Sequence, residues 1–235
     1  MGRLNGKVAV VAGGATARRL AAEGAAVVIG DLETGNAEAI AREIAASGGQ
    51  ALGIGLDISE EPSVAGLVEA AVSRFGVLDL MHANAVDVDL AVLDRTIAVS
   101  LRGHLLCTRL AIPQMLRCGG GAIVYTSSSA AFIGEPERPC YAMAKAGANA
   151  PMRHVASRWG RQGIRANAVA PGLVLTENNL RTMPEEVKKR ALAHGRSTPL
   201  GTPDDIAATV VHLPSDDGAW INGQVISMDG GSTLR

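Results

Sequence analysis

The most constraining feature of this chain is a regular alternation of short, wholly apolar segments with longer helical patterns. Seven of the apolar segments are expected to be strands: Val8–Ala12, Ala26–Asp31, Ala51–Gly55, Leu78–His82, Ala122–Thr126, Ala166–Ala170 and Gln224–Met228. Continuous apolar strands are buried on both faces, which is typical of a parallel sheet covered by helices. The alternation therefore predicts a doubly wound α/β fold with three layers, helices covering both faces of one parallel sheet.

Helical patterns fill the intervals between these segments. They cover Ala15–Glu23, Thr34–Ser47, Glu60–Phe75, Leu93–Leu116, Tyr141–Arg161 and Pro203–Leu213. Thr202 precedes a proline and two aspartates, an order typical of a helix start. Because no linker, repeat or low-complexity tract interrupts the series, we expect a single domain over residues 1–235, with Leu173–Pro199 as a polar insertion after the sixth strand.

Composition excludes several function classes. The 235 residues carry a net charge of −1 and 3% aromatic residues, so nothing resembles the basic, aromatic surface of a nucleic-acid-binding protein. The longest apolar runs, such as Ala25–Ile29, are far too short to span a membrane, and the N-terminus lacks a signal-peptide core. The three cysteines are odd in number and have no metal-ligand spacing. We expect a cytoplasmic protein with reduced thiols, no metal site and a small-molecule partner.

Ligands of doubly wound sheets bind beyond the carboxyl ends of the strands, so the residues at these ends are candidates. They are Gly13, Gly14, Asp31, Leu32, Asp57, Ile58, Asn84, Ser127–Ser129, Pro171 and Gly172. A carboxylate at Asp31 can accept hydrogen bonds from both hydroxyls of an adenosine ribose and would repel a 2′-phosphate. Asp57 can accept a hydrogen bond from an adenine amino group. The alternatives are a turn or capping role for Asp31 and a cap of the following helix for Asp57.

The first turn is short for a phosphate-binding site. Gly13 and Gly14 are followed directly by Ala15-Thr16-Ala17-Arg18, without a third glycine. The backbone amides of Gly14 and Ala15 could still face an anion at the start of a helix. As a signal for dinucleotide binding, however, this turn is weak.

A tyrosine and a lysine four residues apart supply the clearest chemistry. On a helix, Tyr141 and Lys145 lie on one face. Tyrosine ordinarily ionises near pH 10, and a nearby cation lowers that pKa, which makes the pair a plausible general acid/base. Hydroxyls of Ser127–Ser129 could bond a substrate oxygen beside it, or simply form a turn. The alternative for the pair is a coincidence of helix sequence, and we expect the five histidines to be core or surface residues.

Taken together, these residues resemble the short-chain dehydrogenase/reductase family over nearly the whole chain. The motifs that carry the resemblance are Ser128 thirteen residues before Tyr141, the Tyr-x-x-x-Lys itself, Asn167–Gly172, Val174 with Thr176, Trp220–Gln224 and Asp229–Gly231. The resemblance implies a Rossmann-like fold and hydride transfer between NAD(H) and a secondary alcohol or ketone. It also implies a homodimer or homotetramer that associates through the two long central helices and the C-terminal strand region.

The resemblance further implies a role for each matching residue. Tyr141 would be the acid/base, Lys145 would lower its pKa and bind the nicotinamide ribose, and Ser128 would hold the substrate oxygen. Asp31 would favour NAD over NADP. The other cofactor contacts implied are Asp57 on adenine, Asn84 against the ribose, and Pro171, Gly172, Val174 and Thr176 on the nicotinamide side. Ser100 stands where the family has an asparagine that anchors a water in the proton relay.

Several departures from the family pattern leave a second hypothesis open. The glycine-rich turn lacks about six residues of the family motif, and the connection between Asn84 and Val99 is also short. Pro151 falls inside the catalytic helix, where it removes a bond to Gly147 and costs about 3 kcal/mol unless the helix kinks. The chain is therefore either an NAD(H)-dependent oxidoreductase or a non-catalytic relative with impaired cofactor binding, acting as a structural or binding subunit. Binding of another nucleotide or anion at the short turn is a third alternative.

Overall fold

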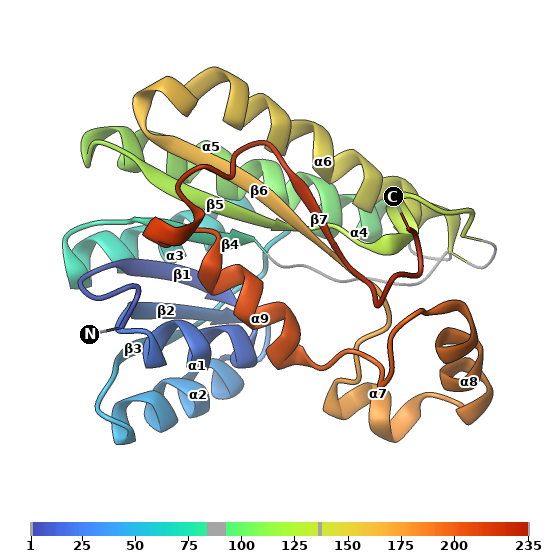
Figure 1. Cartoon of the computed structure of the whole chain (residues 1–235). Coiled ribbons are helices and arrows are strands. Elements are labelled where there is room, and N and C mark those ends of the chain that lie inside the picture. The colour runs from blue at the N-terminus through green and yellow to red at the C-terminus, as the bar shows by residue number, and fades with distance from the viewer. Residues whose placement is uncertain (1, 84–92, 136–137, 235) are drawn as a thin grey trace.

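The fold is built on one sheet of seven parallel strands, seen in a computed structural model that describes residues 2–83, 93–135 and 138–234 (Figure 1). The strands are β1 (Val8–Ala12), β2 (Ala26–Asp31), β3 (Gln50–Gly55), β4 (Leu80–Ala83), β5 (Gly121–Thr126), β6 (Ile164–Pro171) and β7 (Val225–Met228). Their order is β3-β2-β1-β4-β5-β6-β7, and every pair is parallel. Successive strands are added on one side of β1 up to β3 and on its other side from β4 onward. Ligands of such sheets bind at this switch in strand order, between β1 and β4.

Helices cover both faces of this sheet, as the alternation of patterns predicts. One face carries α1 (Gly14–Ala22), α2 (Thr34–Ala46) and α9 (Pro203–His212). The other carries α3 (Glu61–Phe75), α5 (Gly103–Arg117) and α6 (Pro139–Trp159). The expected three-layer, doubly wound α/β domain is therefore confirmed.

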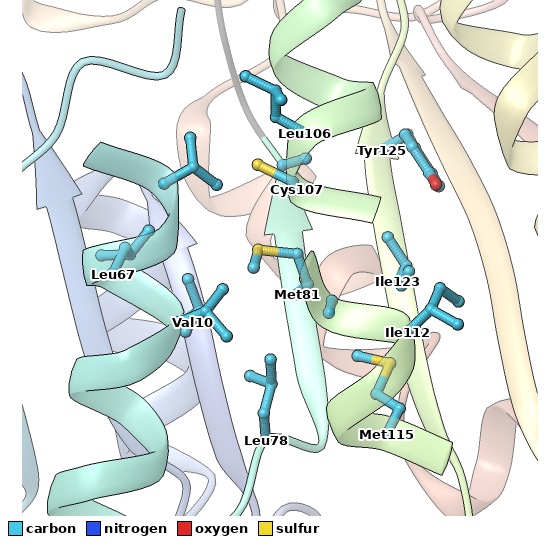
Figure 2. Packing of buried hydrophobic residues seen from close by; sticks show 14 of the residues in the cluster. Val10, Leu67, Leu78, Met81, Leu106, Cys107, Ile112, Met115, Ile123 and Tyr125 are labelled. Carbon is cyan, nitrogen blue, oxygen red and sulfur yellow. The ribbon is translucent and has the colours of Figure 1, made fainter. Parts of the chain in front are cut away.

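The strands are wholly apolar because both of their faces are buried. Val10 of β1 and Met81 of β4 point toward α3 and α5, where they meet Leu67 and Cys107 (Figure 2). The alternate residues of β1, such as Val11, pack instead under the helices of the opposite face. Burial of each such aliphatic side chain stabilises the folded state by about 1.5–3 kcal/mol. The sheet is therefore held to the helices by two apolar clusters, one on each of its faces.

The helix expected over Leu93–Leu116 is not one regular helix, which corrects that prediction. It consists of α4 (Leu93–Ile97), a π-helical turn (Ala98–Arg102) and then α5. In the π-helical turn, the amide of Gly103 donates to the carbonyl of Ala98, five residues back. A single π-helical turn inside an α-helix frequently marks a functional site.

The remaining helical expectations hold with small shifts. The polar insertion Leu173–Pro199 contains two helices, α7 (Glu177–Thr182) and α8 (Glu185–His194), which lie apart from the sheet in Figure 1. Thr202 caps α9 in a reciprocal capping box with Asp205. The catalytic-helix candidate, α6, continues through Pro151 as one α-helix. Among the described residues, no helix is long and apolar enough to cross a membrane.

Candidate active site

The candidate residues gather at one edge of the sheet, although they come from distant parts of the chain. The strand ends that bring them there are those of β1 with Gly13, β2 with Asp31, β3 with Asp57, β5 with Ser128 and β6 with Pro171. Since all seven strands are parallel, these carboxyl ends share the same edge. Asn84 lies outside the described residues, so its expected contact with the cofactor stays a prediction.

Lys145 is anchored to the end of β5 at both its side chain and its backbone. Its Nζ donates to the carbonyl of Thr126 at 3.0 Å, and the Ser127 hydroxyl donates to the Lys145 carbonyl at 3.1 Å. The side chain is fully buried, and this burial lowers the pKa of Lys145 to about 7. Near neutral pH the side chain is therefore close to the point at which the ammonium loses its proton. Thr126 and its role as an anchor were not predicted from the sequence, because a backbone acceptor leaves no residue-type signal.

Tyr141 lies on the same face of α6 as Lys145, as their spacing predicts. The Lys145 Nζ lies 5.8 Å from the centre of the Tyr141 ring. A second cation, the Arg138 guanidinium, lies 4.9 Å from the same ring centre. The negative face of a tyrosine ring attracts cations at such distances, so two basic side chains lie within reach of the phenol ring.

Ser128 follows directly on β5, beside the anchors of Lys145. Its Oγ accepts a hydrogen bond from the Ala130 amide at 3.2 Å, so it does form the turn that was the alternative interpretation. A hydroxyl that accepts one bond can still donate its own hydrogen. Ser128 therefore serves the turn and retains a donor for a substrate oxygen.

Ser100 lies in the π-helical turn, with its side chain fully buried. Its Oγ has no hydrogen-bond partner among the described residues, whereas its carbonyl contacts His104 Nδ1 at 2.7 Å. His104 Nε2 contacts the carbonyl of Ala83 at 3.0 Å, so the ring joins the π-helical turn to the end of β4. Burial lowers the pKa of His104 to about 4, which keeps the ring neutral at pH 7. A neutral imidazole has one N–H, so it can donate to only one of the two carbonyls at a time.

Another buried histidine lies behind Lys145. His82 Nε2 contacts the Thr126 hydroxyl at 3.2 Å, and within the part of the chain that the structure describes its Nδ1 has no hydrogen-bond partner. Burial first, and then the neighbouring His104 and Lys145, lower the pKa of His82 to about 3. His82 and His104 are thus core residues, as expected. Within the described part of the chain, no cluster of His, Cys, Asp and Glu could hold a metal ion.

The shortened first turn still has the electrostatics of an anion site. One residue, Gly13 (φ 126°), separates the end of β1 from the start of α1. No side chain caps α1 and its first turn has no acidic residue, so the positive end of the helix dipole faces the edge of the sheet. A Cβ added to Gly14 would lie 2.9 Å from an Arg18 guanidinium nitrogen, and Arg18 pairs with the exposed Glu43 at 2.6 Å. The residues present therefore fit a phosphate group, on a smaller cradle than the family motif provides.

Asp31 and Asp57 differ in how much of each carboxylate is already engaged. Asp31 accepts one bond, from the Glu33 amide at 2.9 Å. Asp57 accepts both the amide and the hydroxyl of Ser59, and these bonds, with a smaller effect of Arg95, hold the pKa of Asp57 below its usual range. The cap of the following helix is Glu60, so the capping alternative for Asp57 is wrong and its side chain forms a turn instead. Adenine binding by Asp57 stays a prediction.

The residues next to these carboxylates differ in exposure. Leu32 is 62% exposed at the edge of the sheet, where it is accessible to a ligand. Ile58 packs against Gly103, and a Cβ on that glycine would lie 2.9 Å from the Ile58 carbonyl. Ile58 therefore also holds α5 close to the loop after β3, and cofactor contact by either residue stays a prediction.

The segment after β6 is shaped by close packing. A Cβ on Gly172 would lie 2.8 Å from the Cα of Asp229, so only glycine lets this segment approach the C-terminal motif. Val174 forms a bridge with Gly201, and the Thr176 hydroxyl caps α7 by accepting from the Asn179 amide at 3.1 Å. These contacts fix the segment that holds Pro171, Gly172, Val174 and Thr176, and contact of these four residues with a nicotinamide stays a prediction.

Comparisons with known proteins agree with this fold. A family model described as enoyl-(acyl carrier protein) reductase matches residues 11–233. A "probable short-chain type dehydrogenase/reductase" of Bradyrhizobium diazoefficiens is 41% identical over 249 residues, covering 98% of this chain and 89% of that protein. Because that alignment is longer than the 235 residues of this chain, the relative has residues that this chain lacks.

Two further proteins are similar over nearly their whole length. Cis-4-hydroxycyclohexanecarboxylate dehydrogenase of Sinomonas cyclohexanicum is 37% identical over 230 residues, covering 94% of this chain and 92% of that protein. A solved 7α-hydroxysteroid dehydrogenase, complexed with NADH and 7-oxo glycochenodeoxycholic acid, superposes with a TM-score of 0.91 at 30% identity. That match covers 99% of this chain and 96% of the solved one.

Proposed function

Because this chain belongs to the short-chain dehydrogenase/reductase family and is an oxidoreductase, we propose that it transfers a hydride between NAD(H) and a secondary alcohol or ketone. The observation that carries the proposal is Tyr141 beside a buried Lys145 whose ammonium and carbonyl are both anchored to the end of β5. The Sinomonas relative acts on a hydroxycyclohexane and the solved relative binds a 7-oxo compound, so both names support this substrate class.

Tyr141 is the proposed acid/base, and Ser128 and Lys145 assist it. In the reductive direction, the Tyr141 hydroxyl gives its proton to the carbonyl oxygen of the substrate, and in the oxidative direction the same oxygen takes that proton back. Ser128 donates a hydrogen bond to the same substrate oxygen and fixes its position. The Lys145 ammonium, 5.8 Å from the centre of the Tyr141 ring, stabilises the phenolate that forms when Tyr141 gives up its proton. The nicotinamide, when bound, supplies or accepts the hydride.

The proposed cofactor is NAD(H) rather than NADP(H). One oxygen of Asp31 accepts from Glu33, and the other is left for the hydroxyls of an adenosine ribose. A 2′-phosphate at the same place would be repelled by the carboxylate. The open end of α1, with Arg18 beside it, would hold the pyrophosphate.

A non-catalytic role is the second candidate, and one observation favours it. Gly13 is the one residue between β1 and α1. A turn this short offers fewer backbone amides to a pyrophosphate than a longer glycine-rich turn would. A chain that cannot hold the cofactor would act as a structural or binding subunit. Cofactor-dependent turnover by the pure protein would exclude this role.

The two tyrosines of the chain offer a matched test of the proposal. The Tyr141→Phe and Tyr125→Phe variants each lose one hydroxyl, but Tyr125 is buried on β5 against Thr108, away from the substrate side. We expect Tyr141→Phe to lower kcat at least about a hundredfold and Tyr125→Phe to keep most of it. The assay follows NADH formation with cis-4-hydroxycyclohexanecarboxylate and with cyclohexanol. Equal turnover by the wild type and Tyr141→Phe would overturn the assignment of the acid/base.

A further inference from the structure

Arg138 lies at the mouth of the proposed site, directly before α6. Its guanidinium carbon lies 4.9 Å from the centre of the Tyr141 ring, closer than the ammonium of Lys145. The Arg138 side chain is 42% exposed, whereas Lys145 is completely buried. Of these two cations beside the phenol ring, Arg138 is therefore the one that is open to solvent.

Most hydrogen-bonding capacity of Arg138 is unused. Within the described residues, its one recorded hydrogen bond is from Nη2 to the Glu135 carboxylate at 2.9 Å. A guanidinium has five N–H donors, arranged so that two can bind one carboxylate together. Since Glu135 engages a single nitrogen, an edge of the guanidinium remains for another acceptor.

We propose that Arg138 is a specificity-determining residue that binds a carboxylate of the substrate, so that the enzyme acts on hydroxy acids or oxo acids rather than on neutral alcohols. This inference rests on the proposed function, because it places the carboxylate relative to the phenol of Tyr141. The substrate would bridge the site, with its hydroxyl or carbonyl oxygen at Tyr141 and Ser128 and its carboxylate at Arg138.

The ion pair between Glu135 and Arg138 fixes the position of the guanidinium. The Glu135 side chain is only 11% exposed, so it is a nearly fixed anchor for the arginine. This anchor, together with the stacking on Tyr141, holds the guanidinium beside the ring in the absence of ligand. A fixed guanidinium loses less conformational entropy on binding than a free one, which increases the affinity for the carboxylate.

The chain offers a close control for this arginine. Arg158 lies on the same helix and stacks on Trp159, with its guanidinium carbon 5.9 Å from the ring centre. The Arg158→Gln variant therefore loses a charge and a cation–π contact, as Arg138→Gln does, but far from Tyr141 in sequence. Arg138→Lys keeps the charge and loses the planar fork.

The first measurement is equilibrium binding of cyclohexanecarboxylate by calorimetry, with cyclohexanol as the neutral probe. We expect the wild type to bind the acid at least about tenfold more tightly than the alcohol, because a charge-assisted bond contributes about 1.5–3 kcal/mol. Arg138→Gln should lose this preference, Arg138→Lys should keep part of it, and Arg158→Gln should keep all of it. Equal affinities for both probes in the wild type, or equal effects of Arg138→Gln and Arg158→Gln, would overturn the inference.

The second measurement separates this inference from the proposed function. With NAD⁺, we compare kcat/KM for cis-4-hydroxycyclohexanecarboxylate and cyclohexanol in the wild type and in Arg138→Gln. The inference predicts a loss of about tenfold for the acid and little change for the alcohol. Turnover of both compounds without a preference would overturn the inference and leave the proposed function intact. Arg138-dependent binding of the acid without turnover of either compound would support the anion site and count against the proposed function.

Discussion

At the scale of single residues, the site depends on how Lys145 is buried. Its ammonium has no access to solvent and donates a hydrogen bond to the Thr126 carbonyl, an uncharged acceptor. Burial disfavours the charged form, and this desolvation lowers the pKa of Lys145 to about 7. The burial of Lys145 therefore lowers the stability of the folded protein at a residue that the proposed reaction needs.

The pH dependence of stability should reveal this cost. The pKa of Lys145 is about 7 in the folded state and about 10.4 in an unfolded chain. Between these values the unfolded state binds more protons, so this group makes stability rise with pH and is most destabilising below pH 7. We expect Lys145→Met to gain several kcal/mol over the wild type below pH 7, and we expect the gain to shrink toward zero near pH 10.

Denaturant unfolding across this pH range measures the effect. Lys189→Met, at an exposed lysine of α8, is the control and should show no such pH dependence. A constant difference between Lys145→Met and the wild type at all pH values would contradict the account.

Part of this residue-scale picture is predictable from the sequence, and part is not. The spacing of Tyr141 and Lys145 predicts a shared face of a helix, and their place among the other motifs predicts a shared function. The spacing does not say that this face turns inward, because burial is set by the contacts of α6 with β5. Similarly, the Asp57 side chain forms a turn because the amide and the hydroxyl of Ser59 both donate to it. The position of Asp57 after a strand does not predict this local arrangement.

At the scale of elements, the strands and most helices lie within two residues of the bounds that the sequence predicts. Two strands, β1 and β2, match their expected bounds, because continuous apolar runs flanked by turn residues leave little choice. The helix over Leu93–Leu116 was wrong in detail because its π-helical turn depends on a tertiary contact. His104 contacts the Ser100 carbonyl and the end of β4 with the same ring, and no periodicity in the sequence records that contact.

Helix α6 allows a prediction at this scale. Pro151 lies in its interior, where it cannot donate to the Gly147 carbonyl, whereas Pro139 lies at its first turn, where no such donor is needed. We expect Pro151→Ala to stabilise the protein by up to about 3 kcal/mol and Pro139→Ala to be neutral or slightly destabilising. Thermal unfolding of both variants measures the difference. Destabilisation by Pro151→Ala, or equal effects at the two prolines, would show that α6 does not need the missing bond.

At the scale of the whole molecule, several apolar side chains remain exposed on the outer helices and near the C-terminus. Leu105 and Leu116 of α5 are 47% and 39% exposed, Met143 of α6 is 53% exposed and Trp220 is 99% exposed. The family resemblance implies association through these two helices and the C-terminal region. We therefore propose that the protein is a homodimer or homotetramer.

Substitution on α5 tests the proposed assembly. We expect Leu105→Glu to shift the protein toward a smaller species, because a carboxylate would be buried without a partner in the interface. Light scattering after size-exclusion chromatography gives the mass of each species, and circular dichroism confirms that the variant is folded. A wild-type monomer, or an unchanged mass in Leu105→Glu, would contradict assembly through α5.

The central claim is that this chain binds NAD(H) despite its shortened first turn, and an NADH fluorescence titration tests it most directly. The account predicts saturable binding of one NADH per chain, with NADPH bound at least about tenfold more weakly because of Asp31. The Asp31→Asn variant should reduce the difference between the affinities for NADH and NADPH. Fluorescence that fails to saturate at millimolar NADH would contradict the claim and favour the non-catalytic role.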